Sequence, residues 1–521
     1  MEKKKNDFIA QGSILAIASI LVRVMGMIYR IPMTAIIGDK GNGFYSYAYS
    51  VYTILLLLSS YSLPLAVSKM VSAKAQLGQW RNVKRVFICA IAFAIGIGTT
   101  FGLIVLIGAQ LFTRVFFHSE LAAIALRFMA PTILIMALLG VFRGFFQGLQ
   151  NTLPTAVSQI VEGLINAIMS VVFAYFLFDF GHGMDVASGT TDLGYAWGAA
   201  GGAIGTGAGA LAGLIFCFIL FVAYRKILAV NISRDKTGTQ QEYGDIFRLM
   251  LSIALPVILS TALYNLIELV DGSLFNNIMA SKGMEDVKDS MWGAYNAKAL
   301  LLVHIPVSIS SAMAVSLVPT LTAAYALGDE QTAKSKVHAI LRFISILAFP
   351  SAVGLLVLAN PIIKTLFSGD TSAASTYLQV VCPAVITFSF STITNSILQG
   401  IDRMNLPVCH SLIAMAVHVV VLLILCLGFN MGIYGVIISY VIYALVITIL
   451  NFYSISKILE YRPDVITLFV KPAVAMLISV VVAVVVYFAV AVKCKLLTES
   501  VMRDLPKGSM LIRIAKKCRL M

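Results

Sequence analysis

The chain has 521 residues, of which 59% are hydrophobic and only 12% charged, and its formal net charge is +14. This composition excludes a soluble globular protein and predicts a polytopic, multi-pass membrane protein. The basic residues cluster in short loops between apolar runs, which is typical of cytoplasmic loops and argues against a nucleic-acid partner. The seven cysteines include no CxxC pair, so we expect no disulfide, no metal site and no cofactor.

The first half of the chain predicts about six membrane-spanning helices. The loop from Ser68 to Arg85 is basic and has no acidic residue, so this loop and the N-terminus should be cytoplasmic. The loop from Asp179 to Asp192 has three aspartates and no Lys or Arg, which favours the outer side. The predicted spans lie near residues 8–30, 43–67, 86–111, 121–146, 153–178 and 194–224.

The polar segment from Arg225 to Asp245 has a net positive charge and is the best candidate for a linker between two halves. The second half again predicts about six spans, near residues 246–270, 291–319, 336–364, 377–399, 406–428 and 432–455. We therefore place an N-terminal lobe at 1–229, a cytoplasmic linker at 230–245, a C-terminal lobe at 246–463 and a final apolar segment with a basic tail at 464–521.

The two halves resemble each other in sequence. Pro131, Gln147-Gly148 and Leu153-Pro154 are matched, in the same order and at nearly constant spacing, by Pro383, Gln399-Gly400 and Leu406-Pro407. An even number of helices in each half lets both copies keep one orientation, so the pattern indicates a parallel repeat. The expected fold is an all-α protein of two pseudo-symmetric bundles with a cavity between them.

Two arginines interrupt the first apolar span. An arginine near the bilayer centre costs about 2.5–3.5 kcal/mol even on the lenient insertion scale, so such residues usually face a protein interior or a wet cavity. Arg23 and Arg30 are seven residues apart and therefore leave a helix on one face. That face could bind an anion, although the side chain of Arg30 could instead extend to the membrane interface.

Carboxylates end the corresponding span of the second half. Glu268 and Asp271 are three residues apart and are neighbours on a helix surface. We interpret them as candidate gating or coupling residues that face the arginines across the cavity, while a role of Asp271 as a helix cap at the outer interface remains open.

Two further ionisable residues lie deep within predicted spans. Glu162 favours a role at a cavity or in ion coupling, against a buried hydrogen bond to a neighbouring helix. His304 is equally compatible with a gating or coupling role and with a satisfied core histidine.

Glycines recur every four residues in the span near 194–224, at Gly201, Gly205, Gly209 and Gly213. No strand precedes them, so a dinucleotide-binding loop is excluded. The spacing predicts a smooth helix face on which another helix packs closely.

Several stretches carry a family resemblance, namely MIYRIPMTAIIGDKGNGFYSYAYSVYTILLLLSSYSLPLAVSKMV, QGLQNTLPTAVSQIVEGL, SLVPTLTAAYALGD and DLPKGSMLIRIAKK. They resemble the stage V sporulation protein B-like branch of the polysaccharide flippases. That branch lies in the multidrug/oligosaccharidyl-lipid/polysaccharide (MOP) superfamily, which also contains MurJ-type lipid II flippases and MATE multidrug exporters.

The resemblance implies two helical lobes around a central cavity that opens alternately to either side and moves undecaprenyl-diphosphate-linked sugars outward. By resemblance, Arg23 and Arg30 match the family's first-helix basic residues and Glu162 matches the glutamate of its SQxxE segment. This chain has Asn166 where the family commonly has an arginine, so an ion pair at Glu162 cannot be carried over. We take Arg23, Arg30, Glu162 and Asn166 as candidate substrate-binding residues.

The end of the chain departs from the family pattern. Fourteen spans are expected, but only one apolar run, near 466–492, follows the second half and gives roughly thirteen. The basic tail beyond Cys494 predicts a cytoplasmic location by its charge, in conflict with the parity of thirteen spans.

The function that these observations favour is a flippase of the cell membrane, with a lipid-linked oligosaccharide and membrane lipids as partners and Na⁺ or H⁺ as a coupling ion. The alternative is a cation-coupled MATE-type drug exporter, against which the basic cavity residues count. An enzyme would require a sizeable extramembrane domain or paired catalytic carboxylates in a long loop, and the sequence has neither. The sequence leaves open the sugar, the coupling ion, a vegetative or a sporulation role, the effect of the short C-terminal region and the oligomeric state.

Overall fold

The structure is a computed structural model that describes the chain apart from residues 1–17, 19–20, 61–62, 239, 477 and 480–521. All regular elements of this described part are helices. Those of the first half are α2 (Arg30–Ser59), α3 (Leu63–Gln76), α4 (Trp80–Phe117), α5 (Ala122–Gly148), α6 (Leu153–Ser188) and α7 (Leu193–Ser233).

The second half contains α-helices with three π-helical segments in line with them. They are α8 (Tyr243–Ser281), α9 (Glu285–Ala294), η1 (Tyr295–Leu300), α10 (Leu301–Ala326), α11 (Glu330–Val357), α12 (Ala359–Leu366), α13 (Ser372–Val381), α14 (Pro383–Gly400), α15 (Asn405–Leu423), η2 (Ile424–Gly428), α16 (Ile433–Leu459) and η3 (Ile466–Val470).

The predicted polytopic, all-helical fold is confirmed. Nine helices of the described residues are long and apolar enough to cross a membrane, or ten if α13 and α14, which meet at a bend of 44°, form one span. Most of the first predicted span, most of the span near 466–492 and the basic tail beyond Cys494 lie outside the described residues. The count of thirteen spans therefore stays a prediction.

Three helices extend well beyond the predicted spans. α6 continues to Ser188, through most of the segment predicted as an outer loop, and α7 continues to Ser233, so that the linker without helix shortens to residues 234–242. α8 continues to Ser281, although the span was expected to end near residue 270. The predictions were too short because hydropathy marks only the stretch that matches the bilayer core, whereas a helix continues into water until its backbone is interrupted.

A single backbone break divides α2. Gly38 has φ 62° and ψ −174°, a conformation that glycine adopts without a steric penalty. The break lies between Arg30 and Tyr47, in the segment that separates the first two predicted spans.

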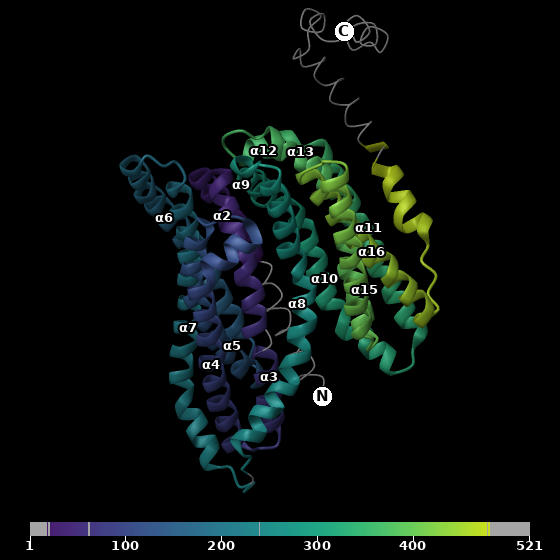
Figure 1. The fold of residues 1–521 in the computed structure, drawn as a ribbon. Coiled ribbons are helices and arrows are strands. Elements are labelled where there is room, and N and C mark those ends of the chain that lie inside the picture. The colour runs from purple at the N-terminus through teal and green to yellow at the C-terminus, as the bar shows by residue number, and fades with distance from the viewer. Residues whose placement is uncertain (1–17, 19–20, 61–62, 239, 477, 480–521) are drawn as a thin grey trace, which may run out of the picture.

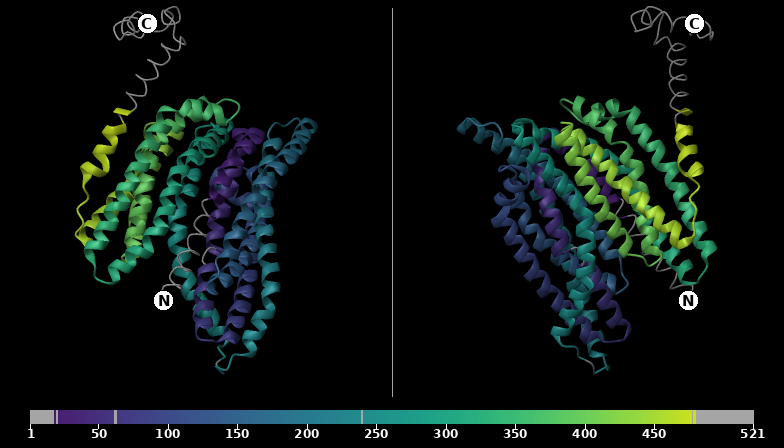
Figure 2. Two further views of the ribbon diagram at one scale, coloured as in Figure 1. Left: turned by 180° about the vertical axis from the view of Figure 1, so that it is seen from behind. Right: turned by 45° about the vertical axis from the view of Figure 1, so that its right-hand side comes forward.

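The helices form two groups. α2 to α7 pack mainly on one another, as do α10 to α16, while α8 touches α3 and α4 of the first group and α15 and α16 of the second. Figure 1 and both views of Figure 2 show the groups meeting at the end that holds α9, α12 and α13, and diverging toward the opposite end. We call the end where the two groups meet the closed end, and the opposite end, where their backbones lie apart, the open end.

The close packing predicted for the glycine face is confirmed at the contact between α6 and α7. A β-carbon at Gly201 would lie 2.4 Å from the backbone of Phe173 and Ala174, and one at Gly205 would lie 2.2 Å from Ser170. Glycine therefore lets the two backbones approach more closely than any other residue would allow.

Candidate functional site

A central cavity of about 460 Å³ lies between the two groups of helices. Its walls come from α2, α8, η1, α10, α14 and α16. Five of the residues singled out in the sequence line it, namely Arg23, Arg30, Glu268, Asp271 and His304.

Two neighbouring cavities extend the central one along the first group. One of about 600 Å³ is lined by Arg23, Arg30, His304 and Asn166 among others, and one of about 150 Å³ is lined by Arg30, Glu162 and Asn166. Each of the seven candidate residues therefore lines at least one of these three cavities, and Arg30 lines all three.

Arg30 is half-buried where these cavities meet. Its guanidinium lies within electrostatic range of Tyr29, Tyr45, Tyr49 and Glu268. Neither Arg30 nor Arg23 has a carboxylate within 4.0 Å among the described residues. Both side chains keep most of their hydrogen-bond donors available to a ligand.

Glu162 has an ion-pair partner that sequence reasoning missed. Arg143 on α5 donates from Nη2 to Glu162 Oε2 at 2.7 Å and from Nε to Ser158 Oγ at 2.9 Å. The family's ion pair could not be carried over because Asn166 replaces its arginine, and here the cation comes instead from a neighbouring helix. An arginine inside the apolar span 121–146 was the sequence signal.

Asn166 has a local role in addition to bordering the cavities. Its Oδ1 accepts a hydrogen bond of 2.8 Å from Ser170 Oγ, and its backbone lies against Gly209 of α7. The side chain is thus held by the close contact between α6 and α7.

Asp271 is not a helix cap. It lies inside α8, ten residues before the helix ends, and its Oδ1 is 2.6 Å from Nε2 of His418 on α15. Both side chains are buried, with 4% and 0% exposed. His418 carried little weight in the sequence, because a lone histidine in an apolar span has no local partner to mark it.

Glu268 and His304 stay close to the arginines. Glu268, one turn before Asp271, lies within electrostatic range of Arg30 and near Ser50 on α2. His304 borders the two larger cavities and lies within electrostatic range of Arg23 and Arg30. The cavity therefore combines cations from the first group with carboxylates and imidazoles from the second.

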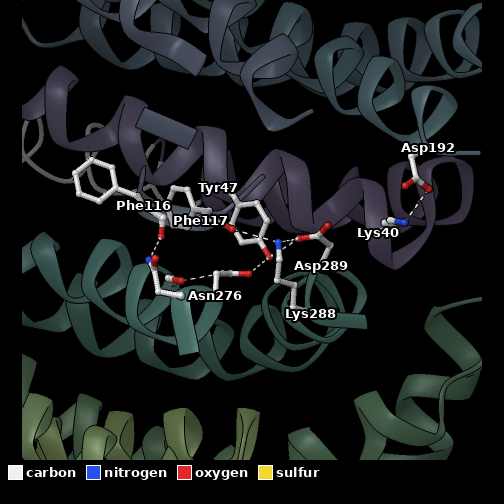
Figure 3. A network of polar contacts seen from close by, with 10 residues as sticks. Lys40, Tyr47, Phe116, Phe117, Asp192, Asn276, Lys288 and Asp289 are labelled. Atoms are coloured by element: carbon white, nitrogen blue, oxygen red, sulfur yellow. Dashed lines mark hydrogen bonds and ion pairs between the residues drawn. The ribbon is translucent and has the colours of Figure 1, made fainter. Parts of the chain in front are cut away.

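A buried polar network seals the closed end (Figure 3). The Tyr47 hydroxyl lies 2.7 Å from Asn276 Oδ1 and 3.0 Å from Asp289 Oδ1. Lys288, only 2% exposed, donates to Asp289 Oδ1 at 2.9 Å and to the Phe117 carbonyl at 3.2 Å. The network joins α2 and α4 of the first group to α8 and α9.

Two ion pairs and a close helix contact surround this network. Lys298 of η1 pairs with Asp39 at 2.7 Å, and Lys40 pairs with Asp192 at 2.7 Å (Figure 3 shows the second pair). The backbones of α2 and α9 also approach closely at Gly43 and Gly293. Sequence reasoning missed these residues, although lysines beside apolar spans offered a signal.

The described residues contain no group of three or more His, Cys, Asp or Glu side chains arranged to hold a metal ion. The central cavity brings two arginines and several aromatic side chains together with the carboxylates of Glu268 and Asp271. Such a site suits an anionic group, and Arg is well matched to phosphate and carboxylate oxygens.

Two protein-family models match the chain. The model for "Polysaccharide biosynthesis protein" matches residues 8–324, and the model for "MatE" matches residues 256–424.

Curated relatives from Bacillus subtilis (strain 168) match most of the chain. The lipid II flippase MurJ is 26% identical over 423 residues, which cover 78% of this chain and 75% of that protein. Stage V sporulation protein B is 24% identical over 460 residues, which cover 87% of this chain and 85% of that protein.

Solved structures share the fold. The inward-facing conformation of a multidrug resistance MATE family transporter of the MOP superfamily superposes with a TM-score of 0.68 at 16% identity, covering 85% of this chain and 98% of that one. A MOP superfamily transporter from Pyrococcus furiosus, described as having a binding pocket of reverse polarity, has a TM-score of 0.59 at 15% identity, covering 86% and 95%.

Proposed function

The chain belongs to the polysaccharide biosynthesis protein family of the MOP superfamily, and from that premise we propose that it moves an undecaprenyl-diphosphate-linked oligosaccharide from the inner to the outer leaflet by alternating access. It is a multi-pass membrane transporter, in line with relatives that are flippases rather than enzymes. What we propose is the substrate, the direction of transport and the residues that bind the substrate.

The observation that carries this proposal is Arg30 at the meeting point of three cavities. A diphosphate placed there would receive donors from Arg30 and Arg23, and guanidinium groups bind phosphate oxygens in a bidentate manner. The neighbouring cavities, of about 600 and 150 Å³, leave space for sugars. The prenyl tail would remain in the bilayer, because burying its many CH₂ groups in lipid is favourable by about 0.8 kcal/mol each.

The arrangement of the ends supports an outward direction of transport. The basic segment that contains Lys69 and Lys74 in α3 and Arg81 at the start of α4 lies at the open end, together with the linker at 234–242. By the bias of cytoplasmic loops toward Lys and Arg, the open end faces the cytoplasm and the closed end faces outward. In this conformation a precursor made inside would reach the cavity while the outer side is sealed.

A second candidate, a cation-coupled exporter of amphipathic drugs, is favoured by the match to the MatE model and by Glu268 and Asp271 in the cavity wall. A cationic drug would need free carboxylates. Here Asp271 is neutralised by His418, and the cavity contains two arginines. The charge balance therefore favours an anionic substrate.

The test uses purified full-length protein in proteoliposomes with a fluorescent undecaprenyl-diphosphate disaccharide. Translocation is read as accessibility of the label to an impermeant reductant. Arg30→Ala should lower the rate at least tenfold, the loss expected when a charge-assisted contact worth about 1.5–3 kcal/mol is removed, and Arg23→Ala should lower it in the same direction.

Arg114→Ala is the matched control, since Arg114 is 71% exposed and only 3.6 Å from Glu120 in a surface ion pair. It should translocate like the wild type. Normal rates for both cavity variants, or transport of a cationic dye in place of the diphosphate lipid, would overturn the proposal.

A further inference from the structure

α8 is attached by polar contacts to both groups of helices. On the first group, Asn276 meets Tyr47 and Asn277 donates to the Phe116 carbonyl at 2.9 Å. On the second group, Lys282 donates to the Cys426 carbonyl at 2.6 Å, and Asp271 pairs with His418. Any change in how the groups are oriented must therefore strain or release contacts of α8.

Among these attachments, the Asp271–His418 pair combines two titratable groups in a dry contact that also borders the cavity. Both side chains are buried, yet Asp271 forms part of the central cavity wall. The distance of 2.6 Å between Nε2 and Oδ1 is typical of a charge-assisted hydrogen bond. The pair thus adjoins the cavity through Asp271.

No neighbouring group takes the place of the proton between Asp271 and His418. The titratable groups that face it are Glu268 on α8, Tyr295 on η1, Tyr443 on α16 with its ring 5.8 Å from the imidazole, and Cys426 on η2. The nearby cations interact with other groups. Lys282 donates to the Cys426 carbonyl and to Asn430, while Arg30 lies within electrostatic range of Glu268. Among the described residues, Asp271 makes its ion pair with His418.

We propose that the Asp271–His418 pair is a proton-binding site, and that H⁺ is the ion coupled to transport. This inference rests on the transport function proposed above and assigns its coupling ion. With Asp271 ionised and both ring nitrogens of His418 protonated, the pair is neutral overall and stabilises α8 against α15. When the imidazolium releases that proton to cavity water, a buried carboxylate faces a neutral ring, and the net charge favours movement of α8 toward water.

The chemistry of the pair favours H⁺ over a metal cation. Hard cations such as Na⁺ prefer several oxygen ligands, whereas here the imidazole already occupies Oδ1 of the carboxylate. The proton-loaded pair thus favours the conformation described, closed at the α9 end, and proton release favours the alternative one.

The experiment measures conformation without substrate, so that it stands apart from the translocation assay. Spin labels are attached to cysteines replacing Leu77 and Leu327, which are 63% and 84% exposed in loops at the open end, in full-length protein whose native cysteines are replaced. Distance distributions are recorded in lipid nanodiscs from about pH 5.5 to about pH 8.5, the range in which a histidine titrates. The wild type should change the ratio of its long and short distances by about tenfold over this range.

His418→Gln and Asp271→Asn should each reduce that change to less than about twofold. His410→Gln is the matched control, because His410 is also buried on α15 but contacts only the neutral Asn451 and Ser454. It should respond to pH like the wild type.

Retention of the full pH response in either monodisperse pair variant would overturn the proposal, as would a wild type that responds to Na⁺ at fixed pH and not to pH. A normal pH response combined with failure of translocation would instead refute the proposed substrate and leave the proton site standing.

Discussion

The close approach of α2 and α9 at the closed end makes a quantitative prediction for Gly293→Ala. A β-carbon at Gly293 would lie 1.8 Å from the Asp39 carbonyl oxygen and 2.7 Å from the Gly43 nitrogen. Contacts under 3.0 Å are essentially never found for real β-carbons, so the two backbones must separate by more than about 1 Å. Because both neighbours are backbone atoms, no side-chain rotation can relieve the overlap.

Overpacking of this kind costs about 1–3 kcal/mol. The structure can avoid the cost by opening the closed end, where α2 and α9 are joined across the two groups of helices. We therefore expect the ratio of molecules open at this end to closed molecules to rise by about 5- to 150-fold. Gly43→Ala should act in the same direction, since its β-carbon would lie 2.3 Å from the Asp289 carbonyl oxygen.

The assay is a distance measurement between spin labels at positions 187 and 368, two exposed sites in the closed-end parts of the first and second groups. Gly354→Ala is the control, because Gly354 is also inside a helix but has no neighbouring atom within 4 Å of the added β-carbon. If Gly293→Ala is monodisperse and keeps the wild-type distances, the contact between α2 and α9 does not hold this end closed.

Two further predictions concern ion pairs and caps. Arg143→Ala should lower the free energy of unfolding by about 2–3 kcal/mol, less than for a fully buried pair because the Arg143 and Glu162 side chains are 11% and 24% exposed. In thermal unfolding, the double variant Arg143→Ala/Glu162→Gln should recover part of the lost stability. If it recovers none, the ion pair does not contribute to stability. Asp235 in the linker accepts hydrogen bonds from the backbone of Arg81 and from Thr237, which lower its pKa from 3.8 to about 2. The stabilisation that ionised Asp235 gives the folded protein is therefore complete above pH 3.8 and is lost as the pH falls toward about 2. The unfolding midpoint of Asp235→Asn should therefore fall less steeply below pH 3.8 than that of the wild type. Parallel curves of midpoint against pH for the two proteins would contradict this assignment.

The helices were predictable because long apolar runs have few alternatives to helix in a membrane. Their ends were not, as the extension of α6 to Ser188 shows, since an amphipathic helical turn in water has no hydropathy signal. The break at Gly38 was equally hidden, because the glycine-rich stretch around it is compatible with a loop and with a helix end.

Individual site residues could be predicted wherever a charged side chain lay in an apolar span. Arg30, Glu268 and Asp271 were found in this way, and all three border the central cavity. Their partners could not be predicted, because His418 lies 147 positions from Asp271 and Arg143 reaches Glu162 from a different helix. Long-range pairing depends on how helices pack, and one sequence does not encode that in its local periodicity.

The glycine contact between α6 and α7 also has a mechanical consequence. With the two backbones interlocked at Gly201 and Gly205, neither helix can slide along the other, and the pair behaves as a single stiff rod. α6 has 36 residues, which corresponds to a length of about 54 Å. A rod of that length pivoting by about 10° at the closed end would carry its far end through about 9 Å. A displacement of about 1 Å near the pivot is thus amplified several-fold at the far end of the rod.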